Sequence, residues 1–418
     1  MIMNIAVIST PNFGHINILK RFVNELKSDK FNFTFILASW TNYVITDEII
    51  ELEKISENIP IVIESSCTAN NTGDTYCRVI ELLPLFLEKC KNFNLIIYDL
   101  MCPEGYIVGK LLKIDTICVE PSYVGIFDNS SINYELELKN NIHHINKIEN
   151  TYNIDLVNNI LLISGNLALL SKRNIIFSWD KLITCGDFNK NTDEIKKICY
   201  FVRPTIPSIN LPIKSEHKLI YFSIGTIAPG LIWDQLKKSS METLHIFIKL
   251  IYDILISICE DRKDINMIVS SKRPVNEITD VKIPNNMYIY KTLNQIEVLR
   301  GADLFITHCG ANSVNEAIDS ETPVIGIPLM FDQHICAKAI EKLDIGYVFL
   351  HENYNESHDY PNSENIYFRY PFCINNFDQA KTILISSIDT ILNKSYVNQF
   401  ESIKNHQKLF FNNLLLKK

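Results

Sequence analysis

The sequence lacks the features that would indicate a zinc ribbon, a redox-active dithiol or a transmembrane helix. Its 11 cysteines include no pair at CxxC spacing. No stretch reaches the roughly 18 to 20 consecutive apolar residues that a spanning helix requires, because polar residues interrupt the longest candidate, residues 156–170. An odd number of scattered cysteines predicts reduced thiols in a cytosol-like compartment. We therefore expect a soluble cytoplasmic protein without a transmembrane segment.

An excess of positive charge is also absent. The chain has 40 Lys and Arg against 48 Asp and Glu, a formal net charge of -8. Nucleic acids and anionic membranes attract clustered positive charge, so no nucleic-acid partner is expected. The apolar N-terminus has no basic residue before it and predicts a first strand rather than a signal peptide.

What the sequence does contain is a repeated alternation of short apolar runs and helical patterns. This alternation predicts parallel sheets built from βαβ units. The expected strands are residues 5–9, 31–38, 59–64, 94–99, 116–120, 219–224, 266–270, 287–290, 304–307, 324–327 and 346–350. Residues 129–172 are expected to be wholly helical.

A length of 418 residues suits two domains, and the periodicity stops at a proline-rich stretch near residue 204. We expect an N-terminal domain at 1–203, a linker at 204–217 and a C-terminal domain at 218–395. A C-terminal helix at 396–418 could pack back on the N-terminal domain. The fold class is therefore α/β, with two doubly wound domains and a cleft between them.

In open parallel sheets, ligands bind beyond the carboxyl ends of the strands. His15 follows the first expected strand, and Asp99 ends the fourth. The turn before His15 has a single glycine where a dinucleotide site would show GxGxxG, which argues against an NAD enzyme. In the second half, the corresponding turns contain Ser223, Gly225, Thr226, His308, Gly310, Asn312 and Ser313.

The segment 308–316 combines a glycine with a predicted helix N-terminus. Gly310 would let the backbone approach a ligand, and the free amides at Asn312 and Ser313 would bind a diphosphate. Glu316, one turn further, could accept hydrogen bonds from ribose hydroxyls. Ser313 and Glu316 also fit a capping box that needs no ligand, so the residues alone leave both interpretations open.

The sequence QIEVLRGADLFITHCGANSVNEAIDSETPVIGIPLMFDQ, residues 295–333, resembles the nucleotide-binding signature of the family 1 UDP-glycosyltransferases. The spacing from Gln295 to His308 is similar to that of the bacterial macrolide and small-molecule branch. GHIN at 14–17 and SIGT at 223–226 stand where that family has its acceptor-side histidine and a second phosphate loop. The resemblance implies the GT-B fold, with Rossmann-like domains facing across a cleft.

The resemblance also implies the ligands and the residues that bind them. A UDP-sugar is the expected donor and co-substrate, a small hydroxylated compound the acceptor, and no metal or other cofactor takes part. The donor-site residues implied by the resemblance are Ser223, Gly225, Thr226, Gln295, His308, Gly310, Asn312, Ser313, Glu316, Asp332 and Gln333. Among them His308 matches the phosphate histidine, Glu316 the ribose glutamate, and Asp332 and Gln333 the pair that binds the hexose, with glucose expected.

By the same resemblance, His15 matches the catalytic base and Asp99 the aspartate that orients it, with inversion at the sugar. A histidine suits general-base work near neutral pH, and a buried aspartate can set its tautomer. Taken without the resemblance, His15 could be a turn residue, Asp99 could cap a helix near Pro103, and Asp332 could cap the helix that follows it.

Several departures from the family pattern stand out. Ile18 and Asn294 replace prolines, and Glu321 replaces a glycine. Lys291 and Thr292 stand where an aromatic residue often stacks on uracil. Two rival functions stay open. One is another GT-B enzyme, such as a nucleotide-sugar epimerase or a cell-wall glycosyltransferase; the other is a non-catalytic sugar-nucleotide-binding protein. The His143–His144 pair is expected to be a solvated part of a helix.

Overall fold

The computed structural model describes residues 2–11, 13–41, 61–68, 75–121, 132–163, 166–184, 199–201, 216–225, 242–291, 293–329, 333–349 and 377–405. The chain divides into two compact units. Unit 1 comprises Met1–Trp179, Phe188–Thr205 and Gln407–Lys418, and unit 2 comprises Asp180–Asp187 and Ile206–His406. The short segment Asp180–Asp187 thus groups with unit 2, although it precedes the expected linker.

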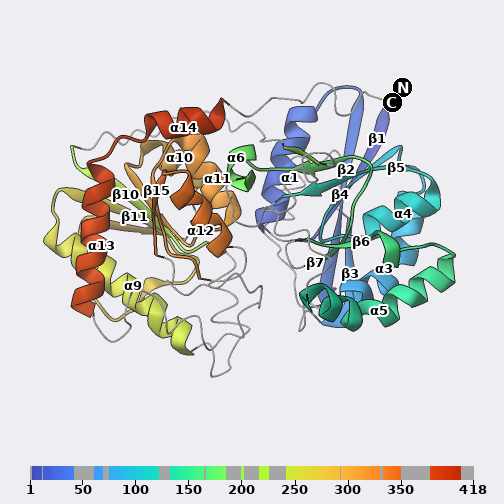
Figure 1. Cartoon of the computed structure of the whole chain (residues 1–418), viewed down its shortest axis with the longest axis horizontal. Coiled ribbons are helices and arrows are strands. Elements are labelled where there is room, and N and C mark those ends of the chain that lie inside the picture. The colour runs from blue at the N-terminus through green and yellow to red at the C-terminus, as the bar shows by residue number, and fades with distance from the viewer. Residues whose placement is uncertain are drawn as a thin grey trace. The chain divides into compact units, whose positions relative to one another are not determined.

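Unit 1 is built on a seven-stranded sheet of order β3-β2-β1-β4-β5-β8-β9, in which every neighbouring pair is parallel. Its strands are β1 (Met3–Ser9), β2 (Phe31–Thr41), β3 (Ile61–Thr68), β4 (Leu95–Asp99), β5 (Asp115–Glu120), β8 (Asn174–Ile176) and β9 (Cys199–Phe201). Helix α1 (Phe13–Leu26) covers one face, and α3 (Thr75–Cys90) and α4 (Glu104–Leu112) cover the other (Figure 1).

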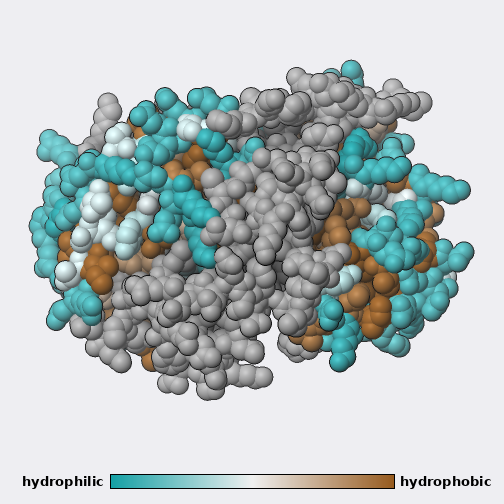
Figure 2. All heavy atoms as spheres, viewed as in Figure 1, coloured by the Kyte–Doolittle hydropathy of each residue, from teal (hydrophilic) through white to brown (hydrophobic). Residues whose placement is uncertain are grey.

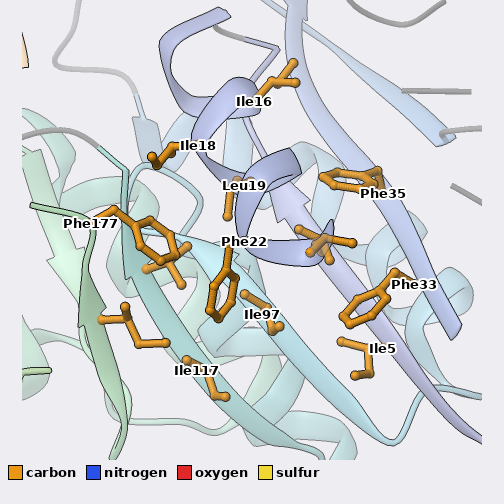
Figure 3. Close-up of a cluster of buried hydrophobic side chains, with 14 of the residues drawn as sticks. Ile5, Ile16, Ile18, Leu19, Phe22, Phe33, Phe35, Ile97, Ile117 and Phe177 are labelled. Atoms are coloured by element: carbon orange, nitrogen blue, oxygen red, sulfur yellow. The ribbon is translucent and has the colours of Figure 1, made fainter. Parts of the chain in front are cut away.

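The core under α1 follows from the alternation of side chains along the strands. Leu19 and Phe22 of α1 point toward the sheet, onto side chains that alternate along each strand, such as Ile97 of β4 and Ile117 of β5 (Figure 3). The ring of Phe22 lies 4.9 Å from that of Phe177 between centroids. Because helices cover both faces, the central strands read as continuous apolar runs, which is why the sequence predicts them well.

The prediction that residues 129–172 are wholly helical is wrong. Helix α5 (Ile132–Tyr152) is followed by a short 3₁₀ turn and by an antiparallel hairpin of β6 (Ile160–Ile163) and β7 (Asn166–Leu169). Short apolar runs cannot be assigned by periodicity alone. Contacts distant in sequence fix the hairpin, since Tyr98 donates to the Leu169 carbonyl at 2.5 Å and Tyr76 to that of Leu167 at 3.4 Å.

Unit 2 contains a six-stranded parallel sheet of order β12-β11-β10-β13-β14-β15. The strands are β10 (Lys218–Ser223), β11 (Ile265–Ser270), β12 (Met287–Tyr290), β13 (Leu304–Thr307), β14 (Val324–Gly326) and β15 (Gly346–Val348). Its helices are α9 (Glu242–Asp261), α10 (Gln295–Gly301), α11 (Ala311–Ser320), α12 (Gln333–Lys342) and α13 (Phe377–Leu392). The eleven expected strands of the two halves are confirmed to within a few residues at their ends.

Two helices at the edge of unit 2 bear on the expected domain boundaries. Helix α14 (Val397–Lys404) contacts α11 and also α6 (Asp180–Thr184), where Lys181 donates to Ser402 at 2.7 Å. The described part of the expected C-terminal helix therefore packs within unit 2. Residues 406–418 lie outside the described residues.

Hydrophilic residues cover much of the described outer surface seen in Figure 2, with hydrophobic residues showing between them. None of the helices in the described ranges is long and apolar enough to cross a membrane. Seven cysteines in these ranges are free thiols, and six of them are buried.

Candidate active site

In unit 1 the structure brings His15 and Asp99 into direct contact. His15 lies in the first turn of α1 rather than in a loop, and Asp99 is the last residue of β4. Strands β1 and β4 are parallel neighbours, so their carboxyl ends meet at one edge of the sheet. The His15 Nδ1 atom lies 2.6 Å from Asp99 Oδ2, with 12% of the histidine side chain exposed and none of the aspartate.

Further contacts hold the Asp99 carboxylate from both sides. The Ser9 hydroxyl donates to Oδ2 at 3.0 Å, and the Met101 backbone N–H donates to Oδ1 at 2.9 Å. Helix α4 begins after Pro103 and has no side-chain cap. The interpretation of Asp99 as the cap of that helix is therefore wrong. A fully buried carboxylate with three donors is suited to hold an imidazole in one orientation.

The geometry determines which nitrogen of His15 can act as a base. A carboxylate at Nδ1 favours the tautomer with its proton on Nδ1, which leaves the lone pair on Nε2. Ile18, which stands where the family pattern has proline, lies within α1, is 1% exposed and packs against the hydrophobic core. The helix thus positions His15 without a proline.

In unit 2, two glycines enclose the ring of His308. Strands β10 and β13 are parallel neighbours, so the turns after Ser223 and Thr307 lie side by side. A Cβ atom added to Gly225 or to Gly310 would lie 2.5 Å from the His308 ring. Gly225 also has a φ of 78°, a conformation that costs other residues about 1–2 kcal/mol. A side chain at either position would therefore have to displace the ring of His308, which lies at the N-terminus of α11.

Protein atoms surround much of the His308 ring. This burial lowers the pKa of His308 from 6.5 to about 4, and a hydrogen bond involving the Ser223 backbone opposes the shift. The side chain is therefore neutral at pH 7. A neutral imidazole can donate one hydrogen bond to a phosphate oxygen but brings no positive charge in the free protein.

The depressed pKa of His308 makes stability depend on pH. Above about pH 6.5 the imidazole is neutral in both the folded and unfolded states, and no cost arises. As the pH falls toward 4, only the unfolded chain takes up the proton, so the folded state loses stability. Between pH 7.5 and pH 5.0 we expect a loss of about 2 kcal/mol from this group. Urea unfolding at both pH values should show a smaller loss of unfolding free energy for His308→Asn than for the wild type. His217→Asn, at an exposed position, should show the same loss as the wild type. An equal loss in all three proteins would contradict the assignment.

The start of α11 does not form the capping box. Gly310 is the N-cap residue and provides no side-chain hydrogen bond, and the helix begins at Ala311. Ser313 instead accepts a hydrogen bond from Gln295 Nε2 at 3.3 Å. The capping interpretation is therefore wrong, and the first amides of a ten-residue helix lie beside His308. Such amides, with the helix dipole, favour an anionic ligand.

A hydrogen-bonded network joins α10 to α11. Gln295 Nε2 donates to Glu316 Oε2 at 2.8 Å, and the Tyr221 hydroxyl donates to Gln295 Oε1 at 3.1 Å. Tyr221 is buried and stacks on Phe305 at 4.8 Å between centroids. The network brings Gln295, Ser313 and Glu316 together.

Gln333 begins α12, where its Oε1 accepts a hydrogen bond from the Leu329 amide at 2.8 Å. The side chain of Gln333 thus binds the backbone of Leu329, the last described residue before α12. Two expected site residues, Thr226 and Asp332, lie outside the described residues. Within the described ranges, no group of three or more His, Cys, Asp or Glu residues is placed to hold a metal ion. Sequence reasoning missed Ser9 and Tyr221. The pairing of β1 with β4 brings Ser9 to Asp99, and the packing of α10 on β10 brings Tyr221 to Gln295.

Comparisons with known proteins find relatives in sequence and in fold. Residues 274–363 match the family model described as UDP-glucoronosyl and UDP-glucosyl transferase. The chain is 24% identical to the uncharacterized UDP-glucosyltransferase YojK of Bacillus subtilis, over 85% of this chain and 87% of that protein. It is 23% identical to the NDP-glycosyltransferase YjiC of the same organism, over 82% and 83%. The solved glycotransferase of kitacinnamycin has a similar fold, with a TM-score of 0.69 at 14% identity, covering 97% of this chain and 94% of that one. The chain therefore has the GT-B fold and is similar in sequence to UDP-glycosyltransferases, which supports a glycosyltransferase enzyme.

Proposed function

We propose that this glycosyltransferase moves glucose from UDP-glucose to a hydroxyl of a small acceptor, with inversion at the anomeric carbon. The observation that carries the proposal is the contact between His15 and the buried Asp99 at the carboxyl edge of the unit 1 sheet. One relative over most of the chain, YojK, bears the name UDP-glucosyltransferase, which supports glucose as the sugar.

In this mechanism His15 Nε2 takes the proton from the acceptor hydroxyl as the oxygen attacks the anomeric carbon. Asp99 holds the imidazole and stabilises the imidazolium that forms. The bond between the sugar and the UDP oxygen breaks on the opposite side, which inverts the configuration. His308 and the first amides of α11 donate to the diphosphate as its negative charge develops.

The remaining donor contacts follow from the positions of the side chains. Gln295 and Glu316 form one hydrogen-bonded group beside the N-terminus of α11, where a nucleoside attached to the diphosphate would lie. We assign Glu316 to the ribose hydroxyls, and Asp332 and Gln333 to the hexose. Thr226 is assigned to the second phosphate loop with Ser223 and Gly225.

Turnover of a panel of UDP-sugars, with and without a panel of phenolic and aliphatic alcohols, tests the proposal. The expected result is release of UDP that depends on acceptor and is fastest with UDP-glucose, together with a β-linked product. Interconversion of the UDP-sugar without an acceptor would favour the epimerase alternative. Tight binding without any turnover would favour the non-catalytic one.

Transfer should also persist in excess EDTA. The groups assigned to the diphosphate are an imidazole and backbone amides, whereas Mg²⁺ sites in proteins use oxygen ligands, mainly carboxylates. Initial rates with and without EDTA should therefore agree within error. Inactivation by EDTA that added Mg²⁺ or Mn²⁺ reverses would contradict the leaving-group role of His308.

The hexose contacts predict a selective loss of affinity. Removing a buried, ligand-paired polar group typically costs about 1–3 kcal/mol, so Asp332→Ala should weaken UDP-glucose strongly and leave UDP almost unchanged. Gln333→Glu sharpens the test, because it keeps an oxygen for the Leu329 amide and replaces the amide donor by a negatively charged acceptor. Calorimetric affinities for UDP and UDP-glucose, with melting temperatures, provide the measurement. Parallel loss of both ligands with early melting would indicate a helix cap instead.

A further inference from the structure

A buried ion pair contacts the turn that follows Asp99, between β4 and α4. Arg78 of α3 and Glu104, the first residue of α4, are both fully buried. The Arg78 guanidinium donates through Nε to Glu104 Oε1 at 2.8 Å and through Nη2 to Oε2 at 3.1 Å. Burying two charges is costly, and such a pair is weak evidence for a role in stability alone. Its contacts point to a second role.

The guanidinium also reaches the backbone of the turn between β4 and α4. Arg78 Nη2 donates to the Met101 carbonyl at 2.8 Å, while the Met101 N–H donates to Asp99 Oδ1 at 2.9 Å. The Cys102 N–H donates to the Asp99 carbonyl at 2.7 Å. The peptide group between Met101 and Cys102 is thus held at its oxygen by Arg78 and at its nitrogen by Asp99. No other cation donates to this turn among the hydrogen bonds of the described residues.

We propose that Arg78, fixed by Glu104, is a positioning residue that holds the Asp99 turn so that the carboxylate meets His15 at Nδ1. The connection runs from the guanidinium to the Met101 carbonyl, from the Met101 N–H to Asp99 Oδ1, and from Asp99 Oδ2 to His15. A planar guanidinium can bind both carboxylate oxygens and the carbonyl at once, which a lysine ammonium cannot match in geometry. The effect of this role on the transfer rate rests on the proposed function of His15.

The decisive variant replaces both charges. Arg78→Met alone would leave Glu104 buried without its partner and could prevent folding. The double variant Arg78→Met with Glu104→Leu removes the pair with side chains of similar size, a change that is often neutral or stabilising. Phe86→Leu, at a fully buried site on the same helix α3, is the matched control for loss of packing.

Three quantities are measured on the full chain: the melting temperature, kcat and donor KM with UDP-glucose, and the proton NMR signal of His15 Nδ1–H. In the double variant we expect folding to be retained, kcat to fall about tenfold or more, donor KM to stay unchanged, and the far-downfield Nδ1–H signal to shift or broaden. Phe86→Leu should keep both kcat and the signal. Arg78→Lys should fall between the wild type and the double variant.

Wild-type kcat and an unchanged His15 signal in the folded double variant would overturn the proposal and leave the pair with a structural role. The NMR measurement also separates this failure from failure of the proposed function. If His15→Ala retained full activity, the proposed role of His15 as the catalytic base would be wrong. The effect of Arg78 on the His15–Asp99 contact would still be read from the Nδ1–H signal.

Discussion

Replacement of His15 by alanine should abolish sugar transfer and leave the affinity for UDP nearly unchanged. The histidine belongs to unit 1, whereas the proposed diphosphate contacts of His308 and α11 belong to unit 2. A general base typically contributes about 10²- to 10⁴-fold to a rate, so kcat should fall by that factor. Initial rates with UDP-glucose and an accepted alcohol, with calorimetry of UDP, provide the measurement.

Asp99→Asn provides a sharper version of the same experiment. The amide is nearly the same size as the carboxylate and can still accept the Met101 N–H, so the fold should persist. An asparagine whose NH₂ group faces His15 would favour the wrong tautomer, and in the Ser-His-Asp enzymes such a change costs about 10⁴-fold. Unchanged turnover in Asp99→Asn would reduce the aspartate to a turn residue. Loss of UDP affinity in His15→Ala would contradict the division of roles between the units.

The sequence predicts most of the strands because helices bury both faces of each parallel sheet. That burial produces continuous apolar runs bounded by polar turns, as in β1 and β4. The parallel arrangement of the strands also places the functional residues, since the carboxyl ends of neighbouring parallel strands meet at one edge of the sheet. His15 and Asp99 are 84 positions apart in the chain and yet in contact. This contact is predictable once the resemblance supplies the fold.

Other parts of the structure depend on partners that no local pattern reveals. The β6–β7 hairpin is fixed by buried tyrosine hydroxyls from β4 and α3. The pair of Arg78 and Glu104 reads in the sequence as two ordinary surface charges, because Arg and Glu are almost never fully buried unless paired. The absence of a capping box at Ser313 likewise follows from where α11 begins, and helix boundaries are the least predictable feature of a sequence.

Gly225→Ala should reduce the affinity for UDP about 10- to 100-fold without unfolding the protein. The added Cβ would lie 2.5 Å from the His308 ring, so the ring must move from the N-terminus of α11. Losing a hydrogen bond to a charged ligand group typically costs about 1.5–3 kcal/mol, which corresponds to this range of affinity. The φ of 78° at this position adds backbone strain. Gly301→Ala is the matched control, because its Cβ would have no neighbour closer than 3.9 Å.

A double-mutant cycle separates displacement of the ring from strain of the loop. In a His308→Ala background the space beside Gly225 is open, so Gly225→Ala should cause little further loss of UDP affinity. Calorimetry of the wild type, both single variants and the double variant gives the coupling between the two positions. If the two losses simply add, Gly225 acts through the loop backbone alone. A coupling close in size to the full effect of Gly225→Ala would show that the glycine is needed because it leaves room for the histidine that binds the diphosphate.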